Sequence, residues 1–143
     1  MSRKNLTTVL ATATVLFTFY LAYCFILTPT TSAPGFGLPT WPDDGDGFLI
    51  VKGCRELAMG LGSGILLVTG QRHALGWILL MTAVAPLGDM INVLAHHGSA
   101  AVALSVHGLT SALIAITGVL LLRETSTTGA THELHTERSA QTA

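Results

Sequence analysis

Three charged side chains lie close together in an apolar stretch, where charges are energetically unfavourable. Lys52, Arg55 and Glu56 fall within residues 48–69, which are otherwise mostly apolar. A charge near the centre of a bilayer costs about 2.5–3.5 kcal/mol even on insertion scales. Acidic and basic groups at this spacing could exchange protons with a bound molecule, or they could neutralise each other. Such residues are therefore candidates for a functional site.

Two later apolar stretches carry ionisable side chains at the same depth. At 1.5 Å per residue, Arg55, Asp89 and His107 each lie roughly 9–10 Å from the same end of their stretches. By helical spacing, polar residues near these ionisable residues in the sequence lie on the same helix faces as they do. We predict one polar pocket between the helices, with these candidate ligand-binding residues: Lys52, Asn92, Tyr20, Tyr23, Met59 and Ser111.

Acid–base chemistry is the reaction type that these residues fit best. Asp89 or Glu56 is the candidate acid or base, and the His107 imidazole can shuttle a proton near neutral pH. The cation of Arg55 or Lys52 could stabilise developing negative charge. The sequence has no nucleophile motif, phosphate-binding loop or dinucleotide fingerprint, which disfavours redox and phosphoryl-transfer enzymes. Isomerisation, cyclisation or hydrolysis of a small lipophilic molecule remains as the expected activity.

A structural interpretation of the same residues stays open. The cations can pair with Glu56 and Asp89, so that polar side chains merely hold helices together. The protein is then a non-enzymatic membrane subunit or an element of an ion-coupled carrier. Because four helices make a small transporter, this alternative predicts a homo-oligomer. The residues do not decide whether the chain is an enzyme.

Histidines and cysteines give no metal-site pattern. Adjacent helical residues diverge by about 100°, so His96 and His97 cannot both bind one ion from a regular helix. His96 is two turns, roughly 10 Å, from Asp89, which is too far for a shared metal. We therefore expect no metal, haem or other cofactor. Whether Cys24 and Cys54 pair is left open.

The composition is that of a membrane protein. Half of the 143 residues are hydrophobic and only 10% are charged, against about 25% in soluble domains. The mean hydropathy is +0.59. A net charge of −1 gives no attraction to nucleic acid, which we exclude as a partner. The lipid bilayer and a small lipophilic ligand are the partners that the sequence predicts.

The apolar stretches predict an all-α, integral membrane four-helix bundle. Each stretch is close to the 20 residues that cross a bilayer, and short connections favour antiparallel neighbours. A cleaved signal peptide is the alternative for the first stretch, but its apolar run exceeds the usual 7–15 residues. The predicted membrane domain, residues 1–124, has spans at about 8–28, 48–69, 75–95 and 101–122 and an outer loop at 29–47; residues 125–143 form a disordered cytoplasmic tail.

Basic residues in the short flanks predict the orientation. Those on one side of the predicted membrane are Arg3, Lys4, Arg72, Arg123 and Arg138. The segments on the other side, residues 29–47 and 96–99, contain neither lysine nor arginine. Because basic flanks stay in the cytoplasm, we predict that both termini are inside. The expected location is the plasma membrane.

Prolines mark two further features. The outer loop holds several prolines and glycines with Phe36 and Trp41, and it could be a lid over the pocket or a mere tether. Pro86 lies one turn before Asp89 and removes a backbone hydrogen bond, so it could kink that helix and open space beside the carboxylate. A proline that the helix simply tolerates is the alternative.

Three short motifs resemble a known family. They are Lys52-Gly53-Cys54-Arg55-Glu56-Leu57-Ala58-Met59-Gly60-Leu61, Gly88-Asp89-Met90 and His107-Gly108. In this order they are similar to those of a family of small four-span integral membrane proteins, known only as a domain of unknown function. The resemblance covers the second to fourth predicted helices. It implies a membrane location and this fold, but no particular reaction.

Overall fold

The computed structural model describes residues 3–41 and 45–124. Within these residues the only regular elements are helices, so the fold is all-α, as predicted. The tail predicted for residues 125–143 lies outside the described residues.

Four long helical segments and several short ones make up the described chain. In chain order the elements are α1 (Arg3–Leu27), α2 (Pro29–Ser32), the 3-10 turn η1 (Ala33–Phe36), α3 (Asp46–Val68), α4 (Arg72–Thr82), α5 (Val84–Ala95), α6 (Ala100–Val102) and the π-helical segment η2 (Ala103–Gly108). α4 and α5 follow one another along one path, Arg72–Ala95. α6 and η2 open a last helix, Ala100–Glu124, which we call the C-terminal helix.

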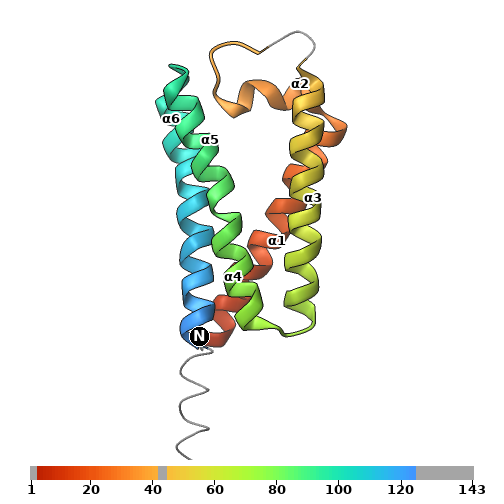
Figure 1. Cartoon of the computed structure of the whole chain (residues 1–143), viewed down its shortest axis with the longest axis vertical. Helices are drawn as coiled ribbons and strands as arrows, with labels where there is room; N and C mark the ends of the chain where they lie inside the picture. Colours follow the sequence, from red (N-terminus) through yellow and green to blue (C-terminus); the bar gives the residue numbers. More distant parts are fainter. Residues whose placement is uncertain (1–2, 42–44, 125–143) are drawn as a thin grey trace, which may run out of the picture.

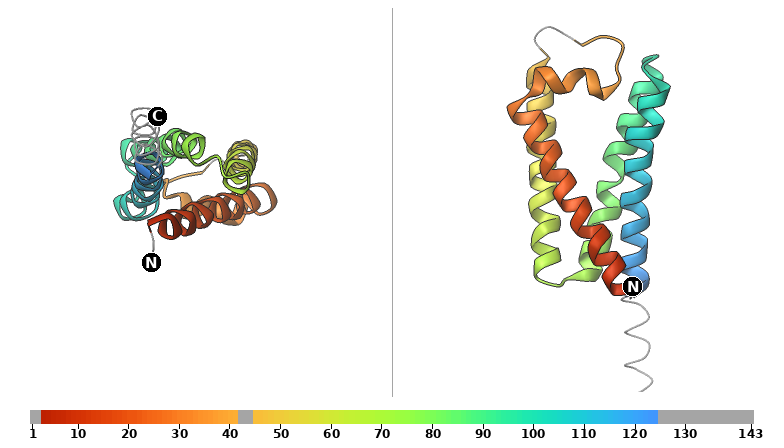
Figure 2. Two further views of the ribbon diagram at one scale, coloured as in Figure 1. Left: turned by 90° about the horizontal axis from the view of Figure 1, so that it is seen from below. Right: turned by 180° about the vertical axis from the view of Figure 1, so that it is seen from behind.

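The long helices run up and down around a common axis (Figures 1 and 2). α1 crosses the bundle obliquely, from the foot of the C-terminal helix to the top of α3 (Figure 2, right). Both ends of the described chain therefore lie at one end of the bundle, which we call the terminal end. α2, η1 and α6 lie at the opposite end, the loop end.

Among the residues that the structure describes, three helices are long and apolar enough to cross a membrane, namely Arg3–Leu27, Arg72–Ala95 and Ala100–Glu124. Large apolar side chains on them face outward, among them Leu16, Met81 and Ile116. Such a surface is stable against lipid tails and unstable in water. The chain is therefore a multi-pass membrane protein in contact with a lipid bilayer.

Apolar clusters hold the bundle together at both ends. At the terminal end, Ala11 of α1 packs with Leu75 and Leu79 of α4 and with Ile114 and Leu121 of the C-terminal helix. Two smaller clusters at the loop end include residues of the segment that follows α1: Ala33 packs with Phe25 and Leu49, and Phe36 packs with Val93 and Ala103. The segment after α1 is thus packed onto both halves of the bundle.

Two elements differ from the sequence-based expectation. The segment predicted as an outer loop begins with two short helical elements, α2 and η1. Pro29 lies at the start of α2 and Pro34 at the start of η1, positions where proline favours a helical turn. The helix predicted for residues 75–95 is interrupted at Ala83, three residues before Pro86. A proline ring clashes with the carbonyl four residues earlier and donates no hydrogen bond to it, and this explains the interruption.

Candidate functional site

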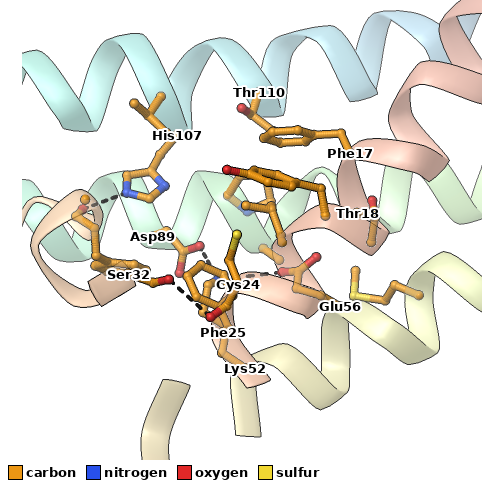
Figure 3. Close-up of a pocket in the computed structure, with 18 of the residues that line it drawn as sticks. Phe17, Thr18, Cys24, Phe25, Ser32, Lys52, Glu56, Asp89, His107 and Thr110 are labelled. Atoms are coloured by element: carbon orange, nitrogen blue, oxygen red, sulfur yellow. Dashed lines mark hydrogen bonds and ion pairs between the residues drawn. The ribbon is translucent and has the colours of Figure 1, made fainter. Parts of the chain in front are cut away.

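A cavity of about 330 Å³ lies between the long helices, towards the loop end. Its walls are mostly apolar, which is usual for sites that hold small molecules. The residues from α1 and the segment after it are Phe17, Thr18, Tyr20, Leu21, Cys24, Phe25, Thr31, Ser32, Gly35 and Phe36. Those from the later helices are Lys52, Glu56, Met59, Thr82, Ala85, Pro86, Asp89, Val106, His107, Thr110 and Ile114. Figure 3 shows how they converge.

The charged wall of the pocket joins α3 to α5. Lys52 Nζ donates a hydrogen bond to Asp89 Oδ2 at 2.5 Å and lies 3.7 Å from Glu56 Oε1, one turn along α3. The side chains of Lys52, Glu56 and Asp89 are 13%, 10% and 20% exposed, so the three charges are largely shielded from the surroundings. In such a site a charge is stable only with a partner. One ammonium group is therefore shared by two carboxylates.

Two phenylalanine rings hold the ammonium group in place. Lys52 Nζ lies 5.6 Å from the ring centre of Phe25 and 5.5 Å from that of Phe36. A cation within about 6 Å of a ring face is attracted by the ring quadrupole. Phe25 comes from α1 and Phe36 from η1, so the lysine contacts three separate parts of the pocket.

His107 faces the pocket from the C-terminal helix. It lies in the π-helical segment η2, a wider turn that often occurs at functional sites. The ring is buried, and its Nε2 lies 2.9 Å from the carbonyl oxygen of Phe36. Because a carbonyl only accepts, Nε2 must carry the hydrogen and donate it. In the neutral ring Nδ1 is then an acceptor, and Figure 3 shows it turned towards the interior of the pocket.

The interrupted helical path of α4 and α5 forms part of the pocket wall. Thr82, Ala85 and Pro86 around the interruption all line the pocket. Ser111 Oγ donates to the carbonyl oxygen of Ala83 at 2.8 Å, which satisfies a backbone acceptor that the irregular turn weakens. Ser111 therefore supports the pocket from behind.

The segment of α2 and η1 closes the loop end of the pocket. We call it the roof. The backbone N–H of Ser99 donates to the Gly37 carbonyl at 2.8 Å, and His107 binds Phe36 as described. On the other side Ser32 Oγ donates to the Cys24 carbonyl at 3.1 Å. The roof is thus bonded to both α1 and the C-terminal helix, and it is an ordered part of the pocket wall.

Six of the ten predicted site residues line the pocket, namely Asp89, Glu56, His107, Lys52, Tyr20 and Met59. The other four do not. Arg55 and Asn92 are exposed, Tyr23 is 57% exposed, and Ser111 is buried behind the pocket. Arg55 directly precedes Glu56, and adjacent helical residues diverge by about 100°, so the two cannot both face the interior. The roles predicted for these residues stay predictions.

The sequence interpretation named Tyr20 and Tyr23 of α1 and a possible lid, but it assigned no site role to the other lining residues of α1 and the roof. Phe36 and Ser32 belong to a segment with no helical periodicity, so spacing could not assign them to the pocket. The signal that could have pointed to the roof was Phe36 itself, an aromatic residue in a segment that contains glycine and proline.

Cys24 also lines the pocket, and both it and Cys54 are free thiols. Among residues 3–41 and 45–124, no three His, Cys, Asp or Glu side chains are close enough to bind one metal ion.

The comparisons with known proteins give a family and no relative of known activity. No curated protein matches the chain, and no solved structure matches it either. A family model matches residues 4–121, which include all the long helices and the residues that line the pocket. The resemblance drawn from the sequence motifs is confirmed: the chain belongs to the family described as Domain of unknown function (DUF4267).

Proposed function

We propose that the pocket binds a small lipophilic molecule and acts on it by acid–base chemistry. The observation that carries the proposal is a cavity with mostly apolar walls and one cluster of shielded ionisable groups. Apolar walls suit a hydrocarbon body, and a few convergent polar groups orient it. Ionisable groups kept away from water are also what proton transfer at a bound molecule requires.

The proposed roles follow from the contacts. Asp89 accepts the short hydrogen bond from the Lys52 ammonium group, and this charge-assisted contact suits a carboxylate that acts as the base. Glu56 has only the longer contact to Lys52, so its carboxylate can take up a proton from a bound molecule and return it, as an acid–base group must. Nδ1 of His107 can accept a proton between them. Isomerisation fits this set best, because one group removes a proton and another returns one, and no co-reactant is needed.

A four-span topology is part of the proposal. α3 has 23 residues and is therefore about 34 Å long, enough to cross a bilayer. Its charges, Lys52, Arg55 and Glu56, keep it from qualifying as a span by composition. Two of the three face the pocket, so only Arg55 would meet the surroundings. With basic flanks at the terminal end, the loop end and the pocket face outward across the plasma membrane.

Thiol labelling tests the topology. In a background with Cys24→Ser and Cys54→Ser, Thr40→Cys and Gln71→Cys each place a single thiol at an exposed position flanking α3. An impermeant reagent added to intact cells should label position 40, and position 71 only after lysis. Labelling of both, or of neither, before lysis would show that α3 does not cross the membrane. Labelling of position 71 alone would invert the orientation.

Mass spectrometry of solvent extracts from the purified protein tests the function. We expect one small lipophilic molecule to co-purify reproducibly. Asp89→Asn and His107→Gln should lose or change it, while Cys54→Ser, on the exposed side of α3, should keep it. All variants must accumulate in the membrane to comparable levels. The same bulk lipids from every variant would contradict a specific pocket.

A non-enzymatic membrane subunit or ion-coupled carrier element is the second candidate. It is supported by the Lys52–Asp89 and Lys52–Glu56 contacts, which already neutralise much of the cluster. This candidate predicts a homo-oligomer, because four helices alone make a small transporter. Asp89→Asn and His107→Gln proteins that are simply degraded, with the wild-type chain oligomeric by light scattering, would favour it.

A further inference from the structure

The pocket has more negative than positive charge. Glu56 and Asp89 face it with two carboxylates, and Lys52 is the one ammonium group among the lining residues. Arg55 lies on the exposed side of α3 and does not line the pocket. An uncompensated charge is costly in a site of low polarity. The second carboxylate therefore needs either a proton or a further cation.

Glu56 is the carboxylate with unused bonding capacity. Its residue is only 8% exposed, yet the cation that forms an ion pair with it, Lys52 Nζ, lies at 3.7 Å and gives its short bond to Asp89 instead. Within the described part of the chain, Glu56 accepts no hydrogen bond shorter than 3.5 Å. Figure 3 shows its carboxylate at the edge of the cavity. A buried carboxylate normally accepts several bonds.

The remaining polar groups of the pocket also favour a donor. The imidazole of His107 is an acceptor at Nδ1, because Nε2 donates to Phe36. The hydroxyl of Thr18 donates to the Thr14 carbonyl, and that of Ser32 donates to the Cys24 carbonyl. These two hydroxyl groups thus donate to the backbone, whereas Nδ1 of His107 and the carboxylate of Glu56 are left as acceptors in the pocket.

We infer that the molecule bound in this pocket is a lipophilic amine, held in its protonated form by Glu56. This inference rests on the proposed function and names the class of its ligand. The ammonium N–H groups would donate to Glu56 and to Nδ1 of His107, and such charge-assisted bonds are the stronger kind. The hydrocarbon part would pack against Phe17, Leu21 and Ile114, which line the same cavity.

Neutral and anionic ligands fit less well. A carboxylate or phosphate group would lie against two carboxylates, and Lys52 is already bonded to one of them. An alcohol could donate one hydrogen bond to Glu56, but it would leave the excess charge uncompensated. Charge is therefore the property that should separate ligands of equal shape.

Three probes with one carbon skeleton test the inference: 4-phenylbutylamine, 4-phenylbutan-1-ol and 4-phenylbutanoate. Binding to the full chain is measured at pH 7 by calorimetry in nanodiscs of zwitterionic lipid, with empty nanodiscs as the partition control. We expect the amine to bind about tenfold more tightly than the alcohol, since a hydrogen bond to a charged group is stronger by about that factor. The carboxylate should bind most weakly.

Two substitutions assign the effect to Glu56. Glu56→Gln should bring the amine down to the affinity of the alcohol, while Glu56→Asp keeps a preference for the amine and shows that the fold tolerates change at this position. Cys54→Ser should behave as the wild type. If the wild type binds the alcohol or the carboxylate as tightly as the amine, or more tightly, the inference of an amine ligand is wrong, while the proposal of a lipophilic binding pocket still holds. Failure of all three probes would overturn the pocket as well.

Discussion

Lys52 is the residue on which the charged wall depends, because it is the partner of both carboxylates. Replacing it by methionine removes the charge, keeps most of the unbranched side chain and leaves Glu56 and Asp89 without the cation that they share. Breaking a shielded ion pair from one side usually costs about 3–5 kcal/mol. The side chains retain 13–20% exposure, so we expect about 2–3 kcal/mol for Lys52→Met, measured by thermal unfolding in detergent.

A second substitution distinguishes lost charge from lost packing. Lys52→Met combined with Asp89→Asn removes the unpaired carboxylate that receives the short bond. The double variant should unfold at a higher temperature than Lys52→Met alone, since residues in direct contact are not additive. Simple addition of the two single effects would mean that the ion pair contributes nothing of its own.

The depth of the ionisable residues along their helices was predictable from the sequence, but the direction in which each side chain points was only partly predictable. The rise per helical residue placed Arg55, Asp89 and His107 at one level. Asp89 and His107 line the pocket, and so does Glu56, the residue after Arg55. To predict whether a side chain points into the pocket, one must know which face of its helix the neighbouring helices cover. On α3 that stripe includes Leu49 and Gly53, small or apolar residues that a search for polar periodicity ignores. Arg55, which polar spacing groups with Lys52 and Glu56, lies at an exposed position of α3.

At the scale of elements, the roof depends on one glycine. Gly37 follows η1 with φ of 95°, a conformation that side chains disfavour. A Cβ at this position would lie 2.8 Å from Cγ1 of Val102. Both effects would move the Phe36 carbonyl away from His107 and the Gly37 carbonyl away from Ser99.

Gly37→Ala should therefore loosen the roof. We expect a loss of about 1–3 kcal/mol in stability and faster amide exchange at Ser99, whose N–H binds the Gly37 carbonyl. Exchange is measured by mass spectrometry in nanodiscs. Gly35→Ala is the matched control, because a Cβ there meets nothing within 4 Å. Equal exchange in the two variants would show that the roof does not depend on the backbone of Gly37.

The elements themselves were predictable to different degrees. Long apolar runs between polar flanks predicted the four helical paths, since length and hydropathy are properties of the sequence alone. The roof was not predictable, because α2 and η1 are short elements of four residues each and are held by contacts with distant residues, such as His107, which lies 71 positions after Phe36. Pro86 did signal an interrupted helix, and the interruption lies at Ala83.

At the scale of the whole molecule, the bundle is closed at one end and hollow at the other. The terminal end combines an apolar cluster with a polar one. Arg72 of α4 donates to Glu124 Oε2 at 2.7 Å and to the hydroxyl groups of Thr7 and Thr8 at 2.6 and 3.0 Å. Thr7 donates in turn to Glu124 Oε1 at 2.8 Å. Three helices are thus joined where they converge.

This arrangement makes Arg72 a test of the architecture far from the pocket. A guanidinium group bonds several partners in fixed directions, whereas an ammonium group acts as a point charge. Arg72→Lys should therefore lower the stability by about 1–2 kcal/mol although the charge is kept. Arg72→Met should lower it further, because the Glu124 side chain, 12% exposed, then lacks its cation. Thermal unfolding in detergent measures both changes, and Arg55→Gln at an exposed position should produce no comparable loss. If Arg72→Lys unfolds like the wild type, charge alone joins the helices, and the directed bonds to Thr7 and Thr8 contribute little to the closed end.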